Sequence, residues 1–405
     1  MRKPVALFFA DSHLDVSAWA ARPTLSGDSM FSFEFIVTQA INLGVKVVVG
    51  AGDLIDVKRP SPIVAKFIRV QMDRLKAAGI DFWFTQGQHE YAIPPWNAAI
   101  HDAPVWIHQQ SKSIDMLGQY RSINVYGIDW TPADKLEEAL ELVPENTDVL
   151  VMHQVWDEFM GEVRGCEGSW SQVPFATTLF TGDYHATHHL RSENGRAHVG
   201  AHGQPLTVIS PGSTNMRKVD EPEDKHFFLL FSDNAWEKRK ILTRPVLRVS
   251  AFDDDALDQI CDNILHKISR SVDVAKGRGL PEQLVKPILH FAYADDLESP
   301  YSRVRDIVSE QAHLFHKAVK QSAEDSEILL SREQRNLAAS KGLTGYLELL
   351  VAREDPDFRA LLRLLDSDDP KTEIEAMRNE RFKVLEDARA EDGDADSRAI
   401  GHNQN

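Results

Sequence analysis

The sequence predicts an α/β fold: a two-sheet αββα sandwich, then a smaller α/β module and a helical C-terminal extension. Three observations lead to this prediction. Continuous apolar runs, typical of strands buried on both faces, alternate with amphipathic helical stretches in the first part of the chain. Short β-rich pieces separated by turn residues follow, and favour an antiparallel continuation. After residue 243 the chain changes to a separate strand–helix–strand–helix pattern.

The first part of the chain has the order of βαβ units. Apolar runs at residues 5–10, 45–49 and 80–84 predict three buried strands. Residues 29–43 and 62–78 between them carry apolar side chains at helical spacing, so each predicts an amphipathic helix. This alternation favours a largely parallel sheet. A short helix at 133–142 and further strands are expected, the strands at residues 123–128, 148–152, 177–181, 197–200, 206–210 and 227–231.

The second part predicts a small α/β module, with strands at residues 246–249 and 288–293 and helices at 254–269 and 302–320. From residue 324 the chain is helical and charged, and residues 358–365 form one apolar helix face. The acidic end has the composition of a disordered tail. The expected boundaries are 1–242 for the sandwich, 243–322 for the module, 323–385 for the helical segment and 386–405 for the tail.

The composition limits the class of protein. A chain of 405 residues with 42% hydrophobic and 26% charged residues has room for two or three domains and an ample core. Its two cysteines, Cys166 and Cys261, stand far apart, which excludes a thiolate zinc site and favours a reducing compartment. Because no apolar stretch approaches the roughly 20 residues that cross a bilayer, we expect a cytoplasmic protein without a membrane partner.

The net charge of −17 counts against a nucleic-acid-binding protein, because such proteins usually carry a basic surface. Much of the acid, however, lies in the C-terminal third of the chain. Carboxylates elsewhere that hold divalent cations would also be offset by the charge of those cations. The charge alone therefore leaves DNA open as a partner.

Clusters of metal-binding residue types follow five of the predicted strands. They are Asp11 and His13, Asp53, Gln88 and His89, His153, and Asp183 and His185. Ligands of α/β sheets lie at the carboxyl ends of the parallel strands, so these side chains are expected to share one crevice. Asp11 and His13 are two residues apart, and so are Asp183 and His185. If strand geometry continues through these pairs, the two side chains of each pair point to the same side of the strand. Any one of these residues alone is more often a cap or a solvated loop residue; the prediction depends on all five clusters together.

The chemistry of these side chains suits divalent metal ions. Carboxylate, imidazole and amide groups without a thiolate are ligands for Mn²⁺, Fe²⁺, Mg²⁺ or Zn²⁺. The candidates outnumber the ligands of one ion, and two ions about 3.5–4 Å apart would suit in-line attack on a phosphate ester. Such ions lower the pKa of water, hold the phosphate and offset charge in the transition state, while a nearby histidine protonates the leaving oxygen.

The order D-x-H, G-D-x-x-D, G-x-H-E, H, G-x-x-H, from Asp11 to His185, resembles the calcineurin-like metallophosphoesterase superfamily. A Pro-Gly-Ser turn at residues 211–213, the small α/β module and the helical extension make the chain similar to the SbcD type of DNA repair and recombination nuclease. Proteins of this type occur in bacteria and phages and are counterparts of the eukaryotic double-strand-break nuclease subunit.

The resemblance implies a role for each residue of the motifs. One ion would be held by Asp11, His13 and His185, and Asp53 would bridge to a second ion. The second site would be completed by Gln88, His153 and Asp183. His89 would be the catalytic acid, with Glu90 orienting its ring, and Asp56 would lie behind the ligands.

Two positions depart from the pattern of the superfamily, and both fall on the second metal. Gln88 stands where Asn is usual, and Asp183 stands where His is usual. A third carboxylate makes the ligand set harder, so two Mn²⁺ ions are expected, with Mg²⁺ or Fe²⁺ as substitutes and Zn²⁺ disfavoured. The other interpretation is that the second site is weak and catalysis suffers.

The leading hypothesis is a Mn²⁺-dependent DNA nuclease subunit, exonuclease or endonuclease, that acts with an SbcC-like coiled-coil ATPase and forms a homodimer. The module would bind DNA and the helical segment would bind the ATPase. An alternative is a phosphoesterase for small-molecule or protein phosphate esters, against which the extra module argues. A third is a scaffold subunit with a decayed second site. The basic pairs at residues 58–59 and 217–218 either contact phosphates or are ordinary solvated surface.

Overall fold

The computed structural model describes residues 2–14, 25, 27–115, 122–160, 168–190, 198–218, 221–251, 257–294 and 298–319. The expected helical segment 323–385 and the acidic tail 386–405 lie outside these residues. Among the described residues no helix is both long and apolar enough to span a membrane.

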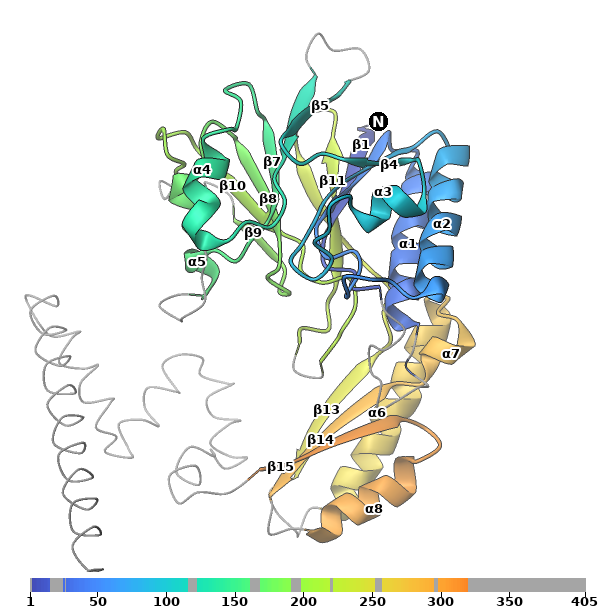
Figure 1. Ribbon diagram of the computed structural model, residues 1–405. Coiled ribbons are helices and arrows are strands. Elements are labelled where there is room, and N and C mark those ends of the chain that lie inside the picture. Colours follow the sequence, from blue (N-terminus) through green and yellow to red (C-terminus); the bar gives the residue numbers. More distant parts are fainter. Residues whose placement is uncertain are drawn as a thin grey trace, which may run out of the picture. The chain divides into compact units, whose positions relative to one another are not determined.

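Two six-stranded sheets face each other and form the larger part of the fold (Figure 1). The first sheet has the order β12-β11-β1-β2-β3-β4, and β1 to β4 run parallel to one another. Its strands are β1 Pro4–Phe9, β2 Val47–Ala51, β3 Asp81–Thr85, β4 Pro104–Trp106, β11 His226–Phe231 and β12 Trp236–Lys240. The helices of its outer face are α1 Asp28–Leu43, α2 Pro62–Ala77 and α3 Trp96–Ile100.

The second sheet has the order β5-β6-β7-β8-β10-β9, with β6, β7, β8 and β10 parallel. Its strands are β5 Gln110–Ile114, β6 Ile123–Gly127, β7 Val149–His153, β8 Thr178–Gly182, β9 His188–Leu190 and β10 Thr207–Ser210. Short helices accompany it: η2 Ala133–Lys135, α4 Leu136–Leu140, α5 Asp157–Met160 and η3 Trp170–Gln172. The strand expected at 197–200 is wrong, since Val199 makes only an isolated bridge to Pro205.

The core between the sheets explains why the apolar runs are continuous. Side chains of β1 alternate between two buried layers: Phe8 faces Phe180 of the second sheet, with ring centroids 5.1 Å apart, while Phe9 packs against Phe33 of α1. A third apolar cluster covers the outer face of the second sheet. Strands buried on both faces have no polar alternation. The predicted αββα sandwich is therefore confirmed.

A three-stranded parallel sheet follows, with the order β13-β14-β15. Its elements are β13 Val246–Ala251, α6 Leu257–Gly277, α7 Glu282–Val285, β14 Ile288–Ala294, α8 Glu298–Val308 and β15 His313–Val319. The helix predicted at 302–320 is wrong in its second half. Residues 313–319 pair with β14 over its whole length, and this long-range pairing overrides the local helical periodicity.

A buried ion pair fastens this sheet to the sandwich. Arg244, just before β13, donates to both carboxylate oxygens of Asp28 at 2.8 Å, and a further guanidinium nitrogen donates to the carbonyl of Lys286 at 2.7 Å. Beside it, Met216 packs with Val246 and Ile288. The small sheet therefore meets the sandwich close to the segment that joins β10 to β11.

Candidate metal centre

The candidate residues gather where five parallel strands end. Asp11 follows β1, Asp53 follows β2, Gln88 and His89 follow β3, His153 ends β7, and Asp183 and His185 follow β8. The structure thus brings all of these side chains to one edge shared by the two sheets, as the sequence predicts for the ends of parallel strands.

The backbone turns sharply at this edge. Asp11, His13, Asp53 and Asp183 have positive φ angles of 52°, 45°, 48° and 78°. Strand geometry therefore does not continue through Asp11 and His13 or through Asp183, and the reason given for their convergence is wrong. Left-handed residues other than glycine cost about 1–3 kcal/mol each and cluster at functional sites. Strained turns, not pleated strands, aim these side chains.

Two glycines of the sequence motifs are explained by close approach to the site. Gly52 has a φ of 79°, and a Cβ there would lie 2.3 Å from Nδ1 of His153. A Cβ on Gly87 would lie 2.0 Å from Oδ1 of Asp53. Both distances are far below van der Waals contact, so any larger residue would push a candidate ligand out of place.

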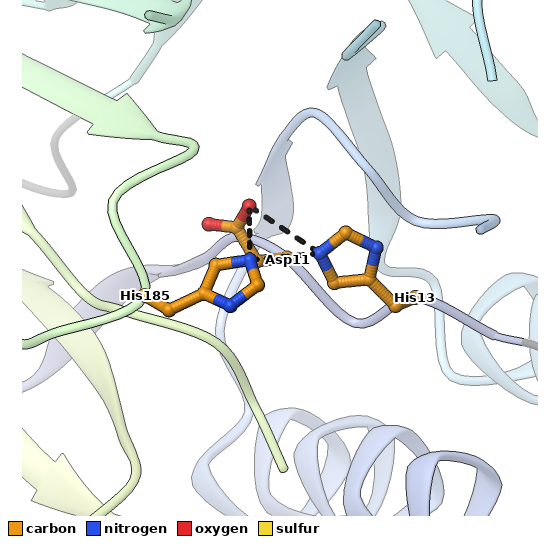
Figure 2. Close-up of side chains that lie close together, drawn as sticks. All are labelled: Asp11, His13 and His185. Carbon is orange, nitrogen blue, oxygen red and sulfur yellow. Dashed lines mark hydrogen bonds and ion pairs between the residues drawn. The ribbon is translucent and has the colours of Figure 1, made fainter. Parts of the chain in front are cut away.

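Asp11, His13 and His185 form the first cluster (Figure 2). Nε2 of His13 and Nε2 of His185 are 3.0 Å apart, and each lies 3.8 Å from Oδ1 of Asp11. Asp11 and His13 are fully buried, and His185 is partly exposed. Two nitrogen ligands at a right angle, each about 2.1 Å from one ion, lie about 3.0 Å apart, so the pair suits adjacent positions on one ion.

Asp11, Asp53 and His153 form the second cluster. Nε2 of His153 is 3.3 Å from Oδ2 of Asp53 and 3.8 Å from Oδ1 of Asp11. The other ring nitrogen of His153 bonds the carbonyl oxygen of Ala51 at 2.8 Å, which leaves Nε2 as the lone-pair nitrogen. Oδ2 of Asp53 also lies 3.8 Å from Nε2 of His13, so this carboxylate reaches both clusters.

Gln88 and Asp183 lie against the second cluster. The amide nitrogen of Gln88 donates to Oδ1 of Asp183 at 2.8 Å, and the same oxygen is 3.9 Å from Nε2 of His153. The backbone N–H of Asp183 donates to both oxygens of Asp11. The two unusual residues thus bond each other, and Oε1 of Gln88 is left buried without a partner.

His89 and Glu90 have different surroundings. The His89 side chain is 41% exposed, and its Nε2 lies 3.9 Å from Oδ2 of Asp53. Glu90 is buried, and its carboxylate accepts from the backbone N–H groups of Leu54 and Ile55 and from the amide of Asn97. The expectation that Glu90 orients the His89 ring is therefore wrong: Glu90 secures the turn after Asp53.

Burial and mutual charge set the electrostatics. Burial raises the pKa of Asp11, although three histidines nearby oppose the shift. Burial would also raise the pKa of Asp53, but the His153 ring beside it lowers that pKa strongly. Burial works against a charge on His153, yet Asp53 and Asp11 raise its pKa well above the ordinary value. The carboxylates therefore attract positive charge strongly, whether carried by a proton or by a metal ion.

Several residues behind the ligands were not assigned from the sequence. Glu221 lies 3.3 Å from Nδ1 of His185 and pairs with the buried Lys225, and no local pattern marks either residue. Arg217, noted only as a basic residue of open role, pairs with Asp56. The predicted place of Asp56 behind the ligands is observed: its Oδ1 is 2.9 Å from Nδ1 of His13.

A buried carboxylate also holds the loop that carries Gln88 and His89. Asp129, after β6, accepts from the backbone N–H and side-chain amide of Gln86 and from the indole of Trp106. Oε1 of Gln86 in turn accepts from the N–H of Ala92. The two ends of residues 86–92 are thus tied together, and Asp129 is a further residue that the sequence did not reveal.

The donor set fits divalent metal ions. Among the described residues, Oδ2 of Asp53, Oε1 of Gln88 and Nε2 of His153 are buried without a hydrogen-bond partner. A buried polar group left without a hydrogen bond costs about 1–3 kcal/mol, so such atoms on three neighbouring candidate ligands favour a bound ion. A carboxylate oxygen, an amide oxygen and an imidazole nitrogen together suit Mn²⁺, Mg²⁺ or Fe²⁺.

Comparisons with known proteins place this centre in context. No model of a known protein family matches the chain. The DNA double-strand break repair protein Mre11 of Methanosarcina mazei is 28% identical over 257 residues, which is 60% of this chain and 39% of that protein. The Mre11 of Methanosarcina acetivorans is 26% identical over 255 residues, 60% of this chain and 40% of that protein. An uncharacterized metallophosphoesterase, YhaO of Bacillus subtilis, is 25% identical over 56% of this chain and 55% of that protein.

The matches are partial. The chain spans about two fifths of the length of the two Mre11 proteins. Among solved structures, a dimetal phosphatase from Danio rerio has a TM-score of 0.36 at 11% identity, over 59% of this chain and 99% of that chain. The fold described above therefore rests on the sheets of this chain itself.

Proposed function

We propose that this chain, a calcineurin-like metallophosphoesterase related to Mre11-type repair proteins, is a metal-dependent nuclease that hydrolyses phosphodiester bonds of DNA. One observation carries the proposal: two clusters of ligand-type atoms meet at four strand ends and share Asp11. Two buried atoms of the second cluster, Oδ2 of Asp53 and Nε2 of His153, have no hydrogen-bond partner among the described residues. These two atoms lie 3.3 Å apart without hydrogen-bond geometry, and a ligand bound by both would account for that arrangement.

The proposed ligand roles are those that the resemblance implies. Asp11, His13 and His185 would hold one ion, Asp53 would bridge, and a second ion would be held by Gln88, His153 and Asp183. Two such ions supply Lewis acidity toward a phosphoryl oxygen and lower the pKa of water. The chain itself contributes fixed ligands on strained turns, so little reorganisation is needed during the reaction.

His89 would be the catalytic acid. Its ring lies at the exposed rim, at least 3.7 Å from the carboxylate oxygens of Asp53 and Asp56, and so remains open toward a substrate. From there it can donate a proton to the sugar oxygen as that oxygen leaves phosphorus.

The test of this role depends on the leaving group. His89→Gln should slow DNA hydrolysis by about 10²–10⁴-fold, because a sugar alkoxide needs a proton to leave. The same variant should hydrolyse bis(p-nitrophenyl) phosphate at nearly the wild-type rate, because p-nitrophenolate leaves without one. Equal losses on both substrates, with metal content unchanged, would show that His89 is not the acid.

DNA is proposed as the substrate because the names of the similar proteins point to double-strand break repair. The small α/β module, with its own sheet, would add surface for a polymeric substrate. The alternative is a phosphatase for small-molecule or protein esters. Rates on an oligonucleotide, on p-nitrophenyl phosphate and on a phosphoprotein, compared at equal Mn²⁺, separate the two: the nuclease predicts a large preference for the oligonucleotide.

Mn²⁺ is proposed as the native ion because Asp183 places a third carboxylate in the ligand set where His is usual, which makes the second site harder. Mg²⁺ or Fe²⁺ would substitute. The scaffold hypothesis predicts fewer than two ions per chain. Metal analysis of the purified protein after dialysis against Mn²⁺ therefore distinguishes it from the nuclease.

A homodimer is proposed through exposed apolar side chains of α2, of the loop before α3 and of the start of α3. Ile63 and Val70, seven residues apart on one helix face, are 62% and 46% exposed, and Ile93 and Trp96 are 74% and 37% exposed. Exposed apolar patches of this kind mark protein interfaces. Light scattering should give a dimer mass for the wild type and a monomer mass for Ile63→Glu/Val70→Glu.

An SbcC-like ATPase is proposed as the partner of residues 323–385, because the apolar helix face that the sequence predicts at 358–365 would suit docking on another protein. The expected location is the cytoplasm. Binding to such an ATPase should be lost when the chain ends at residue 322 and retained when it ends at residue 385.

A further inference from the structure

One segment supplies most of the charged groups behind the first cluster. We call it the strap: residues 211–225, between β10 and β11, of which the structure describes 211–218 and 221–225. The strap is bonded to the site through the backbone, because the N–H of Thr214 donates to the carbonyl of Asp11 and the N–H of Ser213 to that of His185. Its side chains then reach the two histidines of the first cluster from behind.

The first chain of contacts ends at His185. Nδ1 of His185 is 3.3 Å from Oε1 of Glu221, and Oε2 of Glu221 accepts from Nζ of Lys225 at 2.9 Å. The same ammonium group donates to Oγ of Ser213 at 2.7 Å. Lys225 is only 1% exposed. Removing such a charge from water costs several kcal/mol unless it is paired, so this lysine is placed for Glu221.

The second chain of contacts ends at His13. Nδ1 of His13 is 2.9 Å from Oδ1 of Asp56. The guanidinium of Arg217 donates to Asp56 at 2.7 Å and also lies 3.2 Å from the same Nδ1. The carboxylate comes from the loop after β2, but its cation comes from the strap. The two histidines of the first cluster therefore have the same kind of surroundings. A carboxylate faces Nδ1 of each ring, and a positively charged side chain of the strap is paired with that carboxylate.

We propose that Glu221 and Asp56 are positioning residues of one metal subsite, and that Lys225 and Arg217 balance the charges of these two carboxylates. This inference rests on the metal centre of the proposed function. A carboxylate that accepts the Nδ1 hydrogen fixes the ring in the tautomer whose Nε2 carries the lone pair. Both Nε2 atoms then present lone pairs toward the point between them and Asp11. Such partners typically change metal affinity by about 10–100-fold.

The strap is also held from outside the sandwich. Arg248 of β13 donates to the carbonyl oxygen of Glu221 at 2.6 Å. Met216 packs against Val246 and Ile288 of the same small sheet. The small sheet thus bonds the carbonyl of the same residue whose carboxylate faces His185.

The test compares two double variants of the full chain that differ only in whether His185 keeps a hydrogen-bond acceptor for its Nδ1. Glu221→Gln/Lys225→Met removes the charges and keeps an acceptor for His185, whereas Glu221→Met/Lys225→Met removes the acceptor as well. Neither leaves a buried charge unpaired. Mn²⁺ binding is followed by calorimetry and by the electron paramagnetic resonance spectrum of bound Mn²⁺. A control, Glu237→Met/Arg239→Met, removes an exposed ion pair of β12, at 2.7 Å, that lies outside the site.

The variant without an acceptor should bind one of its two Mn²⁺ ions about 10–100-fold more weakly and keep the other. The variant with the amide should stay within about threefold of wild type, as should the control. Equal affinities in the two double variants, or equal weakening of both ions, would overturn the proposal. If the acceptor-free variant lacks a cooperative thermal transition, Asp56→Asn/Arg217→Met is compared with Asp56→Leu/Arg217→Met, which tests the acceptor of His13 in the same way.

This design separates the inference from the function. A wild-type chain that binds no Mn²⁺ would overturn the metal centre and the positioning roles together. A wild-type chain that binds two Mn²⁺ ions and cleaves no DNA would overturn only the nuclease. The affinities of the double variants would then still support or contradict the positioning roles.

Discussion

The two clusters of the metal centre differ in what stands behind their histidines. In the first cluster, Nδ1 of His13 and Nδ1 of His185 face carboxylates at 2.9 and 3.3 Å, and each carboxylate is paired with a cation. In the second, Nδ1 of His153 bonds a backbone carbonyl at 2.8 Å. Charged side chains from distant segments therefore orient one cluster, while the strand backbone orients the other.

The difference extends to the atoms that would face the ions. Nε2 of His13 and Nε2 of His185 are 3.0 Å apart. Oδ2 of Asp53 and Nε2 of His153 are 3.3 Å apart, and neither has a hydrogen-bond partner among the described residues. The second cluster also has the two unusual neighbours, Gln88 and Asp183. We expect the first cluster to bind its ion more tightly, since its ligands are fixed in advance.

The largest expected effect comes from removing the carboxylate that reaches both clusters. Asp53→Asn keeps the side-chain shape but loses a charge that lies 3.3 Å from His153 and 3.8 Å from His13. DNA hydrolysis should fall by about 10³-fold or more, because both ions lose a ligand. Single-turnover rates at saturating Mn²⁺ measure the loss. A rate within tenfold of wild type would show that the two clusters do not depend on Asp53.

A matched pair of variants tests which cluster binds more tightly. His185→Ala should remove the tighter of two classes of Mn²⁺ sites, and His153→Ala the weaker. The classes should differ by about tenfold or more in dissociation constant. Calorimetric titration of both variants and the wild type gives the answer. The comparison fails if the two variants lose the same class of site.

The smallest expected effect concerns the choice of metal. Asp183→His restores the usual imidazole and should raise the affinity for Zn²⁺ relative to Mn²⁺ by about tenfold, because imidazole suits Zn²⁺ better than carboxylate does. The ratio should change only at the weaker class of site. Gln88→Asn, which exchanges one amide for another, serves as the control. An equal change of the ratio at both classes would place Asp183 between the clusters instead of at the second.

The sequence allowed the sandwich and the place of the site to be predicted, because both depend on local patterns. A strand buried on both faces is a continuous apolar run, as at Val5–Phe9, and the residues that follow such runs must lie at strand ends. The left-handed turns at Asp11 and Asp183 were not predictable, since the site imposes them at the expense of local preference.

The features that the sequence does not predict depend on contacts between segments that are far apart along the chain. Glu221 is 36 residues from His185, and Arg217 is 161 residues from Asp56, so no spacing along the chain marks these pairs. Strand β15 was mistaken for helix because its apolar residues also suit a helical stripe, and only pairing with β14 decides between the two. The Glu90 carboxylate is held by the backbone N–H groups of Leu54 and Ile55. Every residue except proline has such a group, so the sequence does not indicate this contact.

The measurement that tests the central claim most directly is the rate of DNA hydrolysis by the purified chain as Mn²⁺ is titrated to two equivalents. The account predicts little activity at one equivalent, full activity as the weaker site fills, and complete loss with a chelator. Full activity at one equivalent would contradict the two-metal centre. No hydrolysis of DNA with both sites filled would contradict the nuclease.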